Sequence, residues 1–149
     1  MRIIQAKPDH FDLLELRAHE ADSMAVDPLS GLAAKSLIEN SICSTMLYQG
    51  KIICLLGFYQ LWPGVVNVWI FPSIHAAAHP VVFLRAAKRY TQGILNDFPC
   101  HRLQSLAIAD KLHNDWMTFL GFEKEGRLAK YTADMVDYEQ WAIIKKDLL

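Results

Sequence analysis

The order of apolar and polar positions predicts most elements of this chain. Arg2–Ala6 alternates weakly with a period of two and predicts a first strand. Pro8-Asp9 then opens a helix. The apolar face of that helix is Phe11, Leu13, Leu14, Leu16 and Ala18. Ala25–Asp27 breaks the pattern, and Asp27-Pro28 predicts the start of a second helix that runs to about Asn40, with Pro at its first position.

Strand-like segments fill the middle of the chain. Ser44–Gln49 and Ile52–Leu61 flank a turn at Gln49-Gly50 or Gly50-Lys51, which is typical of a β-hairpin. Pro63-Gly64 predicts the next turn, and Val65–Phe71 predicts another strand.

The second half alternates between helical and strand periods. The expected elements are a loop at Pro72–His79, a helix from Pro80 to about Phe98, a strand at Leu103–Ile108, a short helix at about Leu112–Leu120, and strands at Glu123–Lys130 and Met135–Lys145. The order β-α-α-β-β-β-α-β-α-β-β predicts the α/β class: a mixed central sheet of six to seven strands flanked by about four helices. No repeat or linker interrupts the pattern, so we expect a single domain over residues 1–149.

Composition excludes several classes of protein. A net charge of −1 gives no overall electrostatic attraction to nucleic acid or to an anionic membrane. The three cysteines are odd in number and lack CxxC spacing, so we expect neither a disulfide framework nor a metal site. The longest apolar runs are far shorter than the roughly 18 residues of a membrane span. We expect a soluble, cytoplasmic protein without a signal peptide.

The most informative segment is the short amphipathic helix that ends in Leu120-Gly121-Phe122 and is followed by two strands. Glycine fits a helix end because it adopts the left-handed conformation there without steric cost. This arrangement resembles the C-terminal part of the GNAT family of N-acetyltransferases, and the order of elements is similar over nearly the whole chain. The resemblance implies acetyl-CoA as the cofactor and an amine as the acceptor, either a small molecule or a protein.

In that family the pantetheine arm of the cofactor inserts where the fourth strand separates from the fifth. The resemblance therefore assigns to Ile70 or Phe71 a backbone N–H that polarises the thioester carbonyl. It also places the pyrophosphate on first-turn amides of the following helix, here around Ala78, His79 and Val81.

The chain departs from the family at that loop. The family usually has two spaced glycines, whereas Ser73–His79 contains none, and Pro80 removes one amide. Two interpretations stay open. The small alanines can allow close approach to phosphate, with His75 or His79 in contact with it, or the segment is a plain connector.

A second departure lies in the helix before Gly121. The family's tyrosine, which protonates the departing thiolate, corresponds by position to Met117, and an asparagine that helps to hold the cofactor falls near Asp110. Trp116 is a core residue or lines a cleft.

The reaction also needs a base that takes the proton of the amine. The candidates are Glu20, Asp22, Glu39 and His75, with Glu20 preferred and His75 as a second catalytic candidate. The run His19–Ser23, which holds Glu20 and Asp22, is more often simply a solvated helix end. Tyr59 and Gln60 either line an acceptor pocket or face solvent in part.

Two functions therefore compete. The first is acetyl transfer to an amine by direct attack. The second is a catalytically inactive binding or assembly protein that acts through a protein partner or as a homodimer. A narrower resemblance, to small GNAT-like proteins of short-tailed bacteriophages, rests on Arg17, Glu20 or Asp22, Trp69 and the helix from His113 to Gly121. It implies the host cytoplasm or the virion as the location. Nucleic-acid binding through Arg85, Lys88 and Arg89 is a third and weaker reading, since these residues also suit a solvated helix face.

Overall fold

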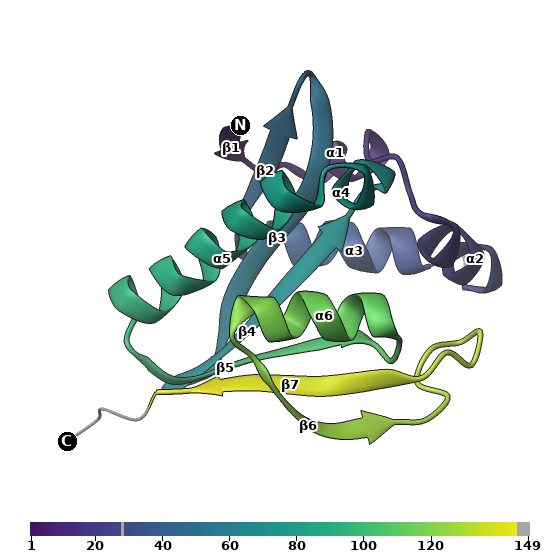
Figure 1. Cartoon of the computed structure of the whole chain (residues 1–149). Coiled ribbons are helices and arrows are strands. Elements are labelled where there is room, and N and C mark those ends of the chain that lie inside the picture. Colours follow the sequence, from purple (N-terminus) through teal and green to yellow (C-terminus); the bar gives the residue numbers. More distant parts are fainter. Residues whose placement is uncertain (28, 146–149) are drawn as a thin grey trace. The chain divides into compact units, whose positions relative to one another are not determined.

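The computed structural model of the chain describes residues 1–27 and 29–145 (Figure 1). In chain order the elements are β1 (Arg2–Gln5), α1 (Pro8–Asp12), α2 (Ala18–Val26), α3 (Ser30–Glu39), β2 (Ile42–Tyr48), β3 (Lys51–Trp62), β4 (Gly64–Pro72), α4 (Ile74–Ala78), α5 (Pro80–Asp97), β5 (Cys100–Ile108), α6 (Lys111–Leu120), β6 (Glu123–Leu128) and β7 (Tyr138–Ile144). The strands form a seven-stranded sheet in the order β1-β2-β3-β4-β5-β7-β6. Because β4 and β5 are parallel while β5 and β7 are antiparallel, the sheet is mixed, as predicted.

The chain divides into two compact units. Unit 1 comprises Met1–Tyr59 and Trp69–Phe83, and unit 2 comprises Gln60–Val68 and the chain from Leu84 onward. The expectation of a single domain stays a prediction.

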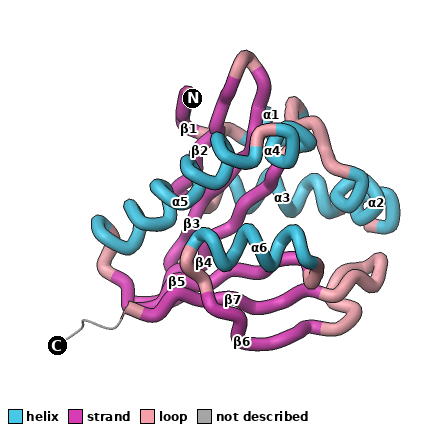
Figure 2. Tube along the Cα trace, in the orientation of Figure 1, coloured by secondary structure: helices cyan, strands magenta, loops and turns pink. Residues whose placement is uncertain are grey.

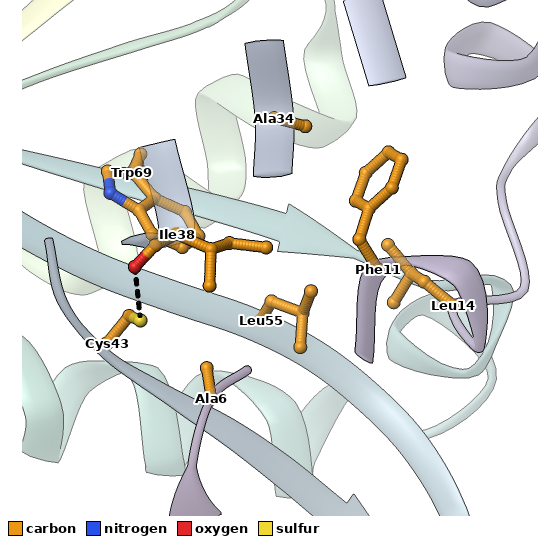
Figure 3. Close-up of a cluster of buried hydrophobic side chains, with 8 residues drawn as sticks. All are labelled: Ala6, Phe11, Leu14, Ala34, Ile38, Cys43, Leu55 and Trp69. Atoms are coloured by element: carbon orange, nitrogen blue, oxygen red, sulfur yellow. Dashed lines mark hydrogen bonds between the residues drawn. The ribbon is translucent and has the colours of Figure 1, made fainter. Parts of the chain in front are cut away.

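The core of unit 1 lies between α1, α3 and the strands beneath them (Figure 3). Its buried side chains are Ala6, Phe11, Leu14, Ala34, Ile38, Cys43, Leu55 and Trp69. The Cys43 thiol donates a hydrogen bond to the backbone carbonyl of Ile38 at 3.3 Å, which joins the end of α3 to β2. The Trp69 indole N–H donates to the Ser41 hydroxyl at 3.0 Å, so this large ring has a fixed position under the helices.

The β2–β3 hairpin confirms the predicted turn. Tyr48 pairs with Lys51, and both residues between them are left-handed, Gln49 with φ 51° and Gly50 with φ 73°. Positive φ at both central positions is the geometry of a type I′ turn, whose twist matches that of the flanking strands.

The predicted length of the first helix is wrong. It ends at Asp12, a new helix begins at Ala18, and α3 follows, so three short helices replace the two expected (Figure 2). Within the connecting segment Leu14 is buried, but Leu13 is 67% exposed and therefore does not belong to the core. The Glu15 carbonyl accepts a hydrogen bond from the distant Ile74 amide at 3.0 Å instead of from an amide of a continued helix. Asp27, which was expected to cap the second helix, accepts the Leu29 amide through Oδ1 at 3.1 Å, and the helix begins at Ser30. Pro28, expected at the first helical position, lies outside the described residues.

Further boundaries differ from the prediction, among them the two that follow. Pro72–His79 is not all loop, because α4 forms within it and three consecutive alanines favour a helix. The last strand begins at Tyr138 rather than Met135, since Met135 has φ 61° and lies in a turn closed by a bond from its amide to the Thr132 carbonyl at 2.9 Å.

In unit 2, α6 lies along β5 (Figure 1) and buries the side chains of His113, Trp116, Met117 and Leu120. Gly121 ends the helix in the left-handed conformation with φ 97°, and the Phe122 amide donates to the Met117 carbonyl at 3.1 Å. The Leu-Gly-Phe ending is thus the helix stop that the sequence predicts.

Candidate functional site

The connection that follows β4 in unit 1 is the place where a GNAT-like cofactor site is expected. Ser73 is fully buried there, and its amide donates to the Ile53 carbonyl at 2.9 Å. Its hydroxyl donates to the Ile52 carbonyl at 2.6 Å and accepts the His75 amide at 3.1 Å, which caps α4. The start of α4 is therefore tied to β3.

The amides of this connection are already occupied. Besides the Ser73 and His75 amides, the Ile74 amide donates to the Glu15 carbonyl at 3.0 Å and the Ala76 amide to the Ser73 carbonyl at 3.1 Å. An anion-binding loop needs amides that point outward without a partner. Four consecutive amides of this segment consequently cannot serve a pyrophosphate without breaking bonds in the protein.

The first turn of α5 offers the remaining amides. Pro80 has no N–H, and the first intrahelical bond runs from the Phe83 amide to the His79 carbonyl at 3.0 Å. The amides of Val81 and Val82 lie between these and have no acceptor inside the helix by its geometry. Ala78 is exposed and the Val81 side chain is 60% exposed, so an anion can approach this turn.

The two loop histidines have partners. The His75 imidazole pairs with the Glu15 carboxylate, which belongs to the segment between α1 and α2. The His79 ring packs edge-on against Tyr48, with 5.2 Å between the ring centroids. Both rings are half-buried. Within residues 1–27 and 29–145, no hydrogen bond or ion pair joins His75 to Glu20.

Glu20, the preferred base, lies in the first turn of α2. The Arg17 guanidinium Nε donates to both of its carboxylate oxygens, at 2.9 and 3.1 Å. The carboxylate is thereby held beside a permanent positive charge. The alternatives Asp22 and Glu39 are exposed.

The strand that carries the expected thioester contact is well packed. The Phe71 ring meets Phe11 edge-on at 5.9 Å between centroids and lies 4.8 Å from the Trp69 ring. Ile70 is half-buried. The assignment of the Ile70 or Phe71 amide to the thioester carbonyl stays a prediction.

Within unit 2 the parallel pairing of β4 with β5 runs from Gly64↔Cys100 to Asn67↔Gln104. The next carbonyl, that of Val68, accepts a hydrogen bond from the buried Ser105 hydroxyl at 2.8 Å. The Ser105 side chain thus bonds to the β4 backbone directly after the last residue pair of this register.

At the start of α6, Asp110 acts as the N-cap. Its Oδ1 accepts the His113 amide at 2.9 Å and lies 2.6 Å from Nδ1 of the His113 ring. The Trp116 ring packs edge-on against His113 at 5.1 Å between centroids. Asp110 therefore orients the buried His113, and their spacing of three residues could have suggested this pairing from the sequence. Met117, at the position of the family's tyrosine, is buried and has no titratable proton.

A buried carboxylate, Glu139, was missed by the sequence reasoning. It accepts from the Asn114 amide group at 2.9 Å and pairs with the Lys124 ammonium at 2.7 Å. Burial tends to raise the pKa of Glu139, but the hydrogen bonds from Lys124 and Asn114 and the charges of Lys124 and Arg127 outweigh it and lower that pKa below its ordinary value. Its partners are 15 and 25 residues away in sequence, so no local pattern announces it.

No group of three or more metal-ligating side chains occurs in residues 1–27 and 29–145. None of the helices in that part of the chain is both long and apolar enough to cross a membrane.

Comparisons with known proteins identify the fold. No family model matches the chain, and no curated protein matches its sequence. Among solved structures, a candidate phosphinothricin N-acetyltransferase superposes with a TM-score of 0.74 at 10% identity, over 98% of this chain and 99% of that one. The chain has the GNAT fold.

Two further GNAT-fold structures are similar over nearly all of the chain. Ribosomal-protein-S5-alanine acetyltransferase from Vibrio fischeri has a TM-score of 0.64 and 15% identity, covering 99% of this chain and 94% of that one. The microcin C7 self-immunity acetyltransferase MccE, solved with acetyl-CoA and AMP, has a TM-score of 0.63 and 12% identity, covering 95% and 91%. The resemblance to phage-encoded proteins stays a prediction.

Proposed function

We propose that the chain is an N-acetyltransferase that uses acetyl-CoA as the acyl donor and an amine as the acceptor. The observation that carries the proposal is the likeness of nearly the whole chain to GNAT-fold acetyltransferases, one of them solved with acetyl-CoA. The exposed first turn of α5 is compatible with such a donor, because the Val81 and Val82 amides are left for one phosphate group.

The donor site differs from the usual one in having fewer amides. The His79 amide also donates to the His75 carbonyl, at 3.0 Å, so with the amides of residues 73–76 it is bonded inside the protein. The pyrophosphate is left with the Val81 and Val82 amides at the start of α5. We therefore expect acetyl-CoA to bind with lower affinity than in an enzyme with a glycine-rich loop. In unit 2, Asp110 and Trp116 contribute by holding His113 and the start of α6 rather than by donating to phosphate.

In the reaction the amine nitrogen bonds to the acetyl carbon while the carbon–sulfur bond breaks. The Ile70 or Phe71 amide stabilises the oxyanion. The amine proton passes to His75, whose imidazole the Glu15 carboxylate orients, or to Glu20. The departing thiolate takes its proton from water, since Met117 has none to give.

The test is release of free CoA, measured by mass spectrometry, from acetyl-CoA in the presence of a panel of amines. His75→Gln is expected to lower the rate about 100-fold, within the usual range for loss of a general base. His101→Gln, which removes an exposed histidine of unit 2, is the matched control and should leave the rate unchanged. A folded chain that shows neither CoA release nor binding of acetyl-CoA by calorimetry would contradict the proposal and favour a binding protein.

A further inference from the structure

Unit 1 contains a cleft apart from the turns assigned to the acyl donor. It has a volume of about 400 Å³ and lies among β1, the end of α1 and the β2–β3 hairpin. Part of its lining is apolar, with Ile4, Leu13 and Leu47. A volume of this order suits a small organic molecule.

Two polar side chains at the cleft form a fixed pair. The Thr45 hydroxyl is 1% exposed and lies 2.8 Å from Nδ1 of His10. The Lys7 backbone amide, which can only donate, is 3.2 Å from the same nitrogen. Nδ1 is therefore an acceptor, and the ring proton of a neutral His10 lies on Nε2, which makes that nitrogen a donor.

Two opposite charges also line the cleft. Lys51 follows the turn at Gly50, and no ion pair is recorded for its ammonium group within the described chain. Glu15 carries a carboxylate that pairs with His75 through one oxygen, Oε2. A simple anion would meet the Glu15 carboxylate, a simple cation would meet Lys51, and a purely apolar molecule would leave both charges without a partner from the ligand.

We propose that this cleft binds a small zwitterion with an apolar side chain, of the class of the aliphatic α-amino acids. Its carboxylate pairs with Lys51 and its ammonium group with Glu15. The side chain lies against Ile4, Leu13 and Leu47, where the burial of its apolar surface favours binding. His10 supplies an Nε2 donor, and its ring is held in place by Thr45.

The test uses three ligands with the same isobutyl body: leucine, 4-methylpentanoate and 3-methylbutylamine. Binding to the full chain is measured by calorimetry without acetyl-CoA, so failure of the acetyltransferase proposal leaves the result interpretable. Leucine is expected to bind at least about tenfold more tightly than either analogue, because each analogue lacks one of the two charged groups. Glycine, which lacks the apolar body, is expected to bind more weakly than leucine.

Two variants test which protein side chain pairs with each charged group of leucine. With Lys51→Met, leucine should bind no better than 3-methylbutylamine binds to the unaltered chain. With Glu15→Gln, leucine should bind no better than 4-methylpentanoate does. Lys111→Met and Glu123→Gln remove exposed charges of unit 2 and should leave leucine binding unchanged.

Three outcomes would overturn the proposal. The first is absence of leucine binding at 10 mM ligand to a chain with native circular dichroism. The second is equal affinity for the three isobutyl ligands. The third is leucine affinity that neither variant at the cleft reduces.

Discussion

Gly57 on β3 provides the sharpest test of the packing that holds β4 in place. A Cβ added at this position would lie 2.5 Å and 2.8 Å from two atoms of the Trp69 ring and 2.7 Å from the Cβ of Cys43. Trp69 is 7% exposed and hydrogen-bonded to Ser41, and Cys43 is 9% exposed, so neither neighbour can move freely into solvent. Gly57→Ala therefore forces a shift in a closed core.

Overpacking of this kind costs about 1–3 kcal/mol, and two rigid neighbours place Gly57→Ala at about 2–3 kcal/mol. The smaller conformational freedom of unfolded alanine returns about 0.5–1 kcal/mol. We expect a net loss of about 1–2.5 kcal/mol in the free energy of unfolding. Urea unfolding followed by far-ultraviolet circular dichroism measures it without relying on the fluorescence of Trp69.

Gly93→Ala is the matched control. Gly93 lies within α5, and a Cβ there meets nothing within 4 Å, so the same change should raise the free energy of unfolding by about 0.5–1 kcal/mol. In a Trp69→Phe background, which removes the two ring atoms of the closest contacts, Gly57→Ala should cost less than in the native chain. A Gly57→Ala protein as stable as the native one would refute the packing described for Trp69.

Three further predictions concern the α6 region and the thiols. Asp110→Ala should lower the free energy of unfolding by about 1 kcal/mol in the same urea assay, because α6 loses its N-cap, whereas Asp110→Asn should keep most of it. Glu139 has a lowered pKa in the folded chain, so its contribution to the free energy of unfolding is present above its unfolded pKa of about 4.3. That contribution is lost as the pH falls through the pKa of the folded chain. The difference in stability between the native chain and Glu139→Gln should therefore shrink below about pH 4. Burial strongly raises the pKa of the Cys54 thiol, so a thiol reagent at pH 8 should label Cys54 only when urea unfolds the chain, and rapid labelling in native buffer would contradict its burial.

Local chemistry explains what the sequence could predict. The turn at Gln49-Gly50 and the helix end at Gly121 depend on the conformational freedom of residues at those positions, and both lie where the pattern places them. The mixed sheet follows from strands interrupted by helices.

Long-range partners explain the features that the sequence could not predict. The first helix ends early where the Glu15 carbonyl accepts from the Ile74 amide, and the Ser73 and Ile74 amides after β4 are occupied by acceptors on distant segments. The pairs His75–Glu15 and Asn114–Glu139 join residues 60 and 25 positions apart. Periodicity within one segment carries no information about such partners.

Backbone amide shifts during titration with acetyl-CoA test the proposed donor site most directly. In a ¹⁵N–¹H correlation spectrum, the amides of Ile70, Phe71, Val81 and Val82 should shift progressively with ligand. Those of residues 73–76 should shift less, because they already donate to acceptors within the protein. A folded chain without shifts at 5 mM acetyl-CoA, or with its largest shifts at residues 73–76, would contradict the account.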